Sequence, residues 1–116
     1  MFFELEERTF QFAVRVRKFC RNLKQDRINL VDITQLIRAS GSIGSNYIEA
    51  NENLGKGDKR MHLRISRKEA KESFYWLRLL FIEGDNTALE NERCVLIDEA
   101  NQFRKIFSVI LEKLPN

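Results

Sequence analysis

The sequence predicts an all-α protein, an antiparallel four-helix bundle whose helices run up, down, up and down. Apolar residues recur every three or four positions in four long segments, which is the spacing of amphipathic helices. The only proline is Pro115, so no predicted helix is interrupted. Five glycines supply few of the turns that a β-fold would need. The 116 residues fit a single domain spanning 1–116.

The first two segments each carry one apolar stripe. The first stripe runs from Leu5 to Leu23. The second occupies Ile33, Leu36, Ser40, Ile43, Tyr47, Ala50 and Leu54. The polar residues between the stripes predict a loop, with Asn29 capping the second helix. Gly41 and Gly44 lie inside that helix, where each glycine costs about 1 kcal/mol relative to alanine. Close approach of another helix would offset this cost.

The third and fourth segments repeat the pattern. The third stripe consists of Leu63, Ser66, Ala70, Ser73, Leu77 and Leu80, and the fourth runs from Leu89 to Leu114. Glycine-containing breaks at 55–58 and 84–87 separate the segments. In the second break, Thr87 and Glu90 predict a capping box. Because the loops are short, consecutive helices should be antiparallel neighbours.

An apolar surplus marks the end of the third segment. Residues 74–82 are predicted to be helical, and their apolar side chains would then point in nearly every direction. A helix in a small bundle buries only one stripe, so another copy of the chain is the simplest cover. The predicted interface residues are Phe74, Tyr75, Trp76 and Leu79. The alternative is that long flanking side chains shield these residues within a monomer.

The sequence gives no sign of secretion or membrane insertion. Acidic and basic residues follow Met1, Phe2 and Phe3 at once, and the densest apolar run is far shorter than the roughly 20 residues of a membrane span. We therefore expect a cytoplasmic protein. Cys20 and Cys94 lack metal-ligand spacing and are expected to be buried, reduced thiols.

The sequence contains no residue pattern typical of a catalytic site. The only histidine is His62, and lysine rather than glutamate stands three residues before it, so a di-iron bundle site is not indicated. No serine or cysteine nucleophile has an evident base, and the glycines at 55 and 57 lack the spacing of a phosphate-binding loop. We expect no enzymatic activity, no metal and no cofactor.

The positive charge is concentrated in one segment. Residues 56–78 contain eight basic and three acidic residues, whereas the whole chain has a net charge of +3. The candidate phosphate contacts are Lys56, Lys59, Arg60, Arg64, Arg67 and Lys68. Such a stripe can attract the backbone of RNA or DNA without reading bases. The alternative is a solvated, partly paired helix face.

Two stretches of this sequence resemble a known family. Residues 35–52, and residues 67–73 followed by 75–80, are similar to the signature of the small bacterial four helix bundle protein family. Its members include proteins encoded by intervening sequences in 23S ribosomal RNA genes, and accessory proteins of diversity-generating retroelements are similar. The resemblance implies a four-helix protomer in a ring-like homopentamer. It also implies association with nucleic acid and a reverse transcriptase in the retroelement branch, and it supplies no catalytic residues.

Polar positions of this signature are predicted to form a structural network. They are Arg38, Ser42, Asn46, Glu49, Glu69 and Glu72. An unpaired buried polar group costs roughly 1–3 kcal/mol, so we expect partners for them. Asn46 and Glu49 are predicted to bond to the third helix. The candidate partners there are Arg64, Arg67 and Lys68.

The functional hypothesis from the sequence is a homo-oligomeric, non-enzymatic accessory protein. It would bind the backbone of RNA or DNA through the basic face of the third helix, and a reverse transcriptase or another protein is a possible partner. The alternative is a structural or protein-interaction module with no nucleic-acid role.

Overall fold

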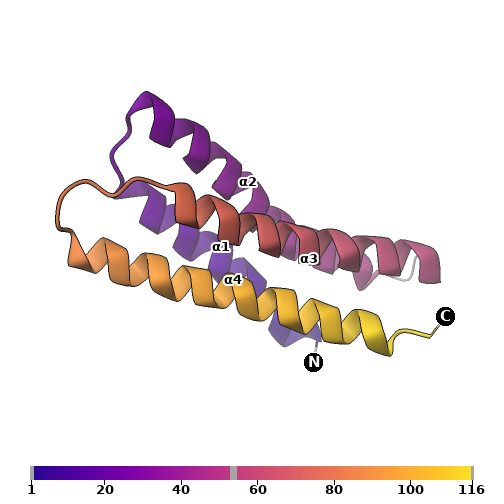
Figure 1. Ribbon diagram of the computed structural model, residues 1–116. Helices are drawn as coiled ribbons and strands as arrows, with labels where there is room; N and C mark the ends of the chain where they lie inside the picture. Colours follow the sequence, from indigo (N-terminus) through magenta and orange to yellow (C-terminus); the bar gives the residue numbers. More distant parts are fainter. Residues whose placement is uncertain (1, 53–54, 116) are drawn as a thin grey trace.

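Four helices make up the part of the chain that the computed structural model describes, residues 2–52 and 55–115. They are α1 (Phe2–Arg21), α2 (Arg27–Ala50), α3 (Lys56–Leu79) and α4 (Thr87–Lys113). Successive helices run in opposite directions, in the order up, down, up and down (Figure 1). Within the described ranges there is no strand, so the all-α prediction is confirmed.

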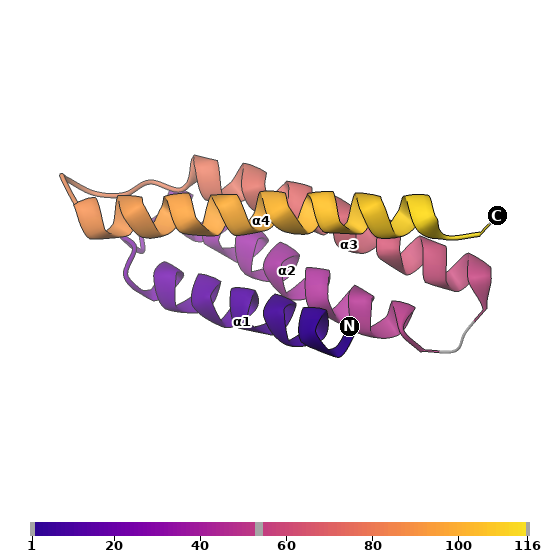
Figure 2. The ribbon, with the colours of Figure 1, turned by 90° about the horizontal axis from the view of Figure 1, so that it is seen from below.

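Each helix packs mainly against the helices that precede and follow it in the sequence. Contacts are most extensive between α2 and α3 and between α3 and α4, whereas α1 packs mainly on α2 and touches α4 least. Figure 2 shows α1 beside α2, and α4 beside α3 along much of its length. Arginine–carboxylate pairs span the looser α1–α4 contact. Arg8 lies 2.7 Å from Glu99, and Arg15 hydrogen-bonds Glu92 at 2.8 Å.

The predicted stripes supply the core. Phe103 and Phe107 of α4 are the largest fully buried side chains. Phe12 packs edge-on against Phe103 with ring centroids 5.4 Å apart, and Tyr47 packs against Phe107 at 5.5 Å. Leu54, predicted to end the second stripe, lies outside the described residues.

Asn29 does not cap α2, contrary to the prediction. Asp26 is the cap, and its side chain accepts a hydrogen bond from the Asn29 backbone at 2.8 Å. The Asn29 side chain is instead buried against the segment that follows α3. Its amide nitrogen donates to the Phe81 carbonyl at 3.0 Å, and its amide oxygen accepts from the Phe81 backbone N–H at 2.8 Å. Asn29 therefore ties the first turn of α2 to the loop that follows α3, two segments far apart in the sequence.

The third helix ends earlier than predicted, at Leu79. Leu80 and Ile82 continue beyond it without helical structure and are buried, with 2% and 7% of their surface exposed. Arg93 of α4 donates to the carbonyls of Leu77 and Arg78 at 3.0 and 3.2 Å. The last carbonyls of a helix lack hydrogen-bond partners within it. Arg93 supplies two such partners and so caps the C-terminal end of α3.

The start of α4 also differs from the prediction. Asn86 is the cap, accepting a hydrogen bond from the Leu89 backbone at 3.1 Å, and Thr87 is the first helical residue. The capping box of Thr87 and Glu90 is therefore wrong by one position. Asparagine and threonine both favour this role, so composition alone did not separate them.

The two cysteines occupy different environments. Cys20 is buried, and this burial raises the pKa of its thiol to about 11. Cys94 is exposed, which contradicts the expectation that it is buried. Over the described ranges, none of the four helices combines the length and hydropathy required to cross a bilayer.

The glycines of α2 differ in what surrounds them. A Cβ placed on Gly44 would lie 2.8 Å from Oγ1 of Thr9, a buried residue of α1. A Cβ on Gly41 would meet only the end of the Arg17 side chain, at an ordinary 3.5 Å. The predicted close approach of another helix is confirmed at Gly44 and is not present at Gly41.

This difference predicts opposite effects of alanine at the two glycines. Gly44→Ala should lower the free energy of unfolding by about 1–3 kcal/mol, because the new methyl group forces α1 and α2 apart. Gly41→Ala should leave it unchanged or raise it by up to about 1 kcal/mol, through better helix propensity. Urea unfolding followed by circular dichroism measures both. Equal effects at the two positions would contradict the packing described here.

Candidate nucleic-acid interface

The basic residues of α3 are arranged by helical spacing. Positions 64, 67, 68 and 71 are three or four residues apart, so their side chains share one flank of the helix. Arg64, Lys68 and Lys71 are exposed, and Arg67 is partly exposed. This flank faces α4, the helix that packs beside α3 on that side.

A groove of about 770 Å³ lies between α3 and α4 and collects these cations. It is lined by Arg64, Arg67, Lys68, Lys71, Phe74, Asn101, Arg104 and Ser108. Five of these residues are basic, and the lining contains no carboxylate, histidine or cysteine. We call this hollow the basic groove. A concave site with one sign of charge focuses the field on an anionic ligand.

Most of the cations in the basic groove are available to a ligand. Arg64, Lys71 and Arg104 form no ion pair with any carboxylate of the described residues. Arg67 reaches the Ser108 hydroxyl at 3.4 Å across the groove. Lys68 lies 3.7 Å from a Glu72 oxygen, an exposed contact that contributes little.

The remaining predicted cations lie nearer the start of α3. Arg60 donates to the Pro115 carbonyl at 3.0 Å and borders a second, shallower hollow with Arg64 and Lys68. Lys59 lines neither hollow. The side chain of Lys56 lies outside the described residues. The structure thus brings Arg64, Arg67 and Lys68 together in the basic groove and leaves Lys59 and Arg60 outside it.

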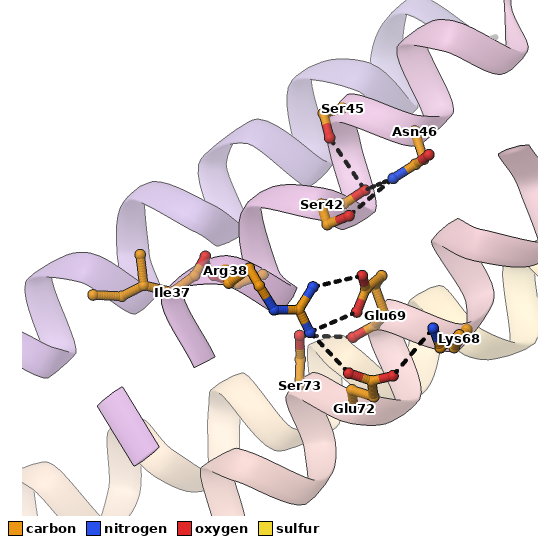
Figure 3. A network of polar contacts seen from close by, with 10 residues as sticks. Ile37, Arg38, Ser42, Ser45, Asn46, Lys68, Glu69, Glu72 and Ser73 are labelled. Carbon is orange, nitrogen blue, oxygen red and sulfur yellow. Dashed lines mark hydrogen bonds and ion pairs between the residues drawn. The ribbon is translucent and has the colours of Figure 1, made fainter. Parts of the chain in front are cut away.

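Arg38 pairs with Glu69 and Glu72, two acids of α3 that do not line the basic groove. Figure 3 shows its guanidinium reaching from α2 to two carboxylates of α3. It donates to the Glu69 oxygens at 2.9 and 3.4 Å and to a Glu72 oxygen at 3.0 Å. The hydrogen bond to Glu69 raises the pKa of Arg38 further above its usual value. Glu69 is buried, so this pairing satisfies a charge that would be costly if left alone.

The rest of the predicted polar network has other partners than expected. Asn46 donates to the carbonyl and hydroxyl oxygens of Ser42, both at 2.9 Å (Figure 3). Its amide oxygen lies 3.0 Å from Nδ1 of His62, which joins α2 to α3. Glu49 is exposed and bonds to no described residue of α3. The predicted partners were wrong because the arginines and lysine proposed for these bonds lie on the α4 flank of α3.

The four predicted interface residues point in different directions. Phe74 is partly buried at one end of the basic groove, and the Arg78 guanidinium lies 5.2 Å above its ring. Tyr75 is 52% exposed and packs edge-on against Trp76. Leu79 is 48% exposed and, with Ile28 of α2, borders a small hollow at the loop end of the bundle.

Sequence reasoning missed the contribution of α4 to the site. Asn101, Arg104 and Ser108 line the basic groove at spacings of three and four residues, a pattern that marks one helix face. Arg104 was not predicted as a site residue because the fourth segment contains more acidic than basic residues. Among the described residues, no three histidine, cysteine, aspartate or glutamate side chains are placed to hold a metal ion. The chemistry that the groove offers is the binding of anions.

Comparison with known proteins gives a consistent assignment. The family model described as 23S rRNA-intervening sequence protein matches residues 3–108. A crystal structure of a protein of unknown function from the S23 ribosomal protein family of Bacteroides thetaiotaomicron is similar in fold, with a TM-score of 0.79. The two sequences are 27% identical, and the match covers 93% of this chain and 98% of that one. No curated protein matches the chain.

Proposed function

This chain belongs to the 23S rRNA-intervening sequence protein family, and we propose that it is a non-enzymatic, homo-oligomeric accessory protein that binds the backbone of RNA or DNA. The basic groove is the observation that carries this proposal. Five cations from two helices surround one hollow, and no acid lines it. Phosphate contacts of this kind supply most of the affinity of sequence-independent binding. The ligand would be bound in the cytoplasm.

The charge distribution indicates a phosphate-binding site rather than a helix face that is only solvated. A surface stripe is usually neutralised by neighbouring acids, whereas Glu69 and Glu72 pair with Arg38 of α2, and Glu72 makes only an exposed 3.7 Å contact with the groove cation Lys68. Arginine can bind phosphate through two parallel hydrogen bonds, and Arg64, Arg67 and Arg104 supply three such groups. No residue pattern here reads base edges in a duplex, so binding should depend weakly on sequence.

Self-association is the second part of the proposal. Several large apolar side chains around the loop end of the bundle are exposed. They are Ile28, Val31, Tyr75, Leu79 and Phe81. Ile28, Leu79 and Phe81 border one hollow, and an apolar patch of this kind is costly in water unless another protein covers it. A homopentameric ring would cover such surfaces and repeat the basic groove around its axis, which would add the fields of the subunits.

A module that binds only proteins is the alternative, and one observation favours it. A second groove, of about 420 Å³, lies between α1 and α2, and exposed Phe10 and Ile48 border it. Small residues such as Ala13, Gly41 and Gly44 form part of its lining. A helix of another protein, such as a reverse transcriptase, could pack there, and the basic residues would then serve only solubility.

Charge reversal in the basic groove should abolish nucleic-acid binding. Arg64→Glu, Lys71→Glu and Arg104→Glu combined should weaken binding of a labelled RNA by more than about tenfold, measured by gel shift. The matched control reverses three basic residues outside the groove, Lys18, Arg21 and Lys113. For the unmodified protein, five phosphate contacts predict a slope of log K against log salt of roughly −3.5 to −4.5. Affinity that is equal at low and high salt, or that survives the groove reversal alone, would reject the proposal.

Self-association predicts a solution mass well above that of one chain. Light scattering coupled to size exclusion should give about five times the 13.8 kDa protomer. Tyr75→Glu combined with Leu79→Glu should reduce this mass while leaving the helical circular dichroism intact. A monomer at micromolar concentration would contradict the oligomer without affecting the proposed binding.

A further inference from the structure

We propose that the basic groove prefers single-stranded nucleic acid to a duplex, with phosphates along its cations and a base against Phe74. This inference rests on the proposed function and names the ligand class for that site. It is carried by the order of side chains along the groove and by the aromatic ring at one end. Neither feature is needed to bind a phosphate backbone alone.

The groove is a short track with a defined direction. From Arg64 to Phe74 the α3 wall covers ten residues, which at 1.5 Å per residue is about 15 Å. Because α4 is antiparallel to α3, Ser108 lies opposite Arg67, where the two side chains meet at 3.4 Å, and Asn101 lies towards the Phe74 end. A strand in the groove would therefore pass from an end that holds two arginines and a hydroxyl to an end that holds a ring and an amide.

The Phe74 end has the features of a base-stacking site. The Arg78 guanidinium lies 5.2 Å over the Phe74 ring, and Arg78 is itself exposed. Unstacked bases bind to aromatic rings and to arginine guanidinium planes. Asn101, on the opposite wall, can both donate and accept hydrogen bonds with the edge of such a base. Phe74 packs partly against the hydrophobic core, and the part of its ring that faces the groove offers a surface for a base rather than for a phosphate.

Duplex binding would leave these groups unused. In a double helix the bases are stacked inside, and the phosphates reach a protein wall first. A groove that acted by charge alone would favour the duplex, which has the higher charge density and the steeper dependence on salt. A preference for the single strand therefore cannot arise from the five cations alone, and it distinguishes this inference from simple phosphate binding.

The test compares one RNA in two states. Fluorescence anisotropy measures the affinity of a labelled 12-nucleotide RNA alone and annealed to its complement, at one salt concentration. The unmodified protein should bind the single strand at least about fivefold more tightly. Phe74→Leu should weaken single-strand binding about tenfold, the typical effect of losing one stacked base, and change duplex binding by less than about twofold.

Matched variants keep this test interpretable. Phe74→Trp retains an aromatic ring and should preserve the preference for the single strand, even if Phe74→Leu impairs folding. Phe3→Leu removes an exposed ring of α1 that does not line the groove and should leave both affinities unchanged. Polyphosphate should compete with RNA less effectively per phosphate than an unlabelled single strand does.

The outcomes separate the two proposals. Equal affinity for both RNA states, with binding that Phe74→Leu does not alter and groove charge reversal removes, would overturn the single-strand inference and leave the proposed function standing. Polyphosphate that competed as well as RNA would likewise overturn the single-strand inference alone. Absence of binding to both RNA states would overturn both proposals.

Discussion

The positive charge of the basic groove depends on the pairing of Arg38 with Glu69 and Glu72. This pairing holds Glu69 and Glu72, two of the three acids of residues 56–78, on the α2 side of α3, and neither of them lines the groove on the α4 side. The pairing also determines helix register, because Glu69 is buried and needs its charged partner. A contact between a half-exposed arginine and a buried glutamate thus links the packing of α2 on α3 to the charge of the groove between α3 and α4.

The groove follows from this separation of charge together with the packing of α4. The antiparallel contact of α3 and α4 brings Arg104 into line with the cations of α3. The end of α3 is held by Arg93, and the segment beyond it is held by Asn29, so the walls of the groove are anchored at the loop end of the bundle. Helix walls that keep their positions need no backbone rearrangement on binding, which favours affinity for an extended anionic ligand.

The sequence was sufficient to predict most of the fold and only part of the site. Apolar periodicity located all four helices because a stripe of this kind is a local property. The role of Asn29 was not predictable, since its partner Phe81 lies 52 positions away. Likewise, Arg104 belongs to an acidic segment, and only the antiparallel packing of α4 brings it to the basic helix. Gly44 was recognised as unusual, whereas its contact with Thr9 of α1 required the structure.

The central claim is that Arg38 keeps carboxylates away from the basic groove, although it does not itself line that groove. The most direct measurement is the affinity of Arg38→Met for a labelled RNA, compared with Arg27→Met, which removes the same charge from an exposed position of α2. With Arg38 gone, Glu72 can tighten its 3.7 Å contact with Lys68 and neutralise that groove cation, so Arg38→Met should weaken binding several-fold more than Arg27→Met does. Equal losses for the two variants would show that only total charge matters and would contradict the account.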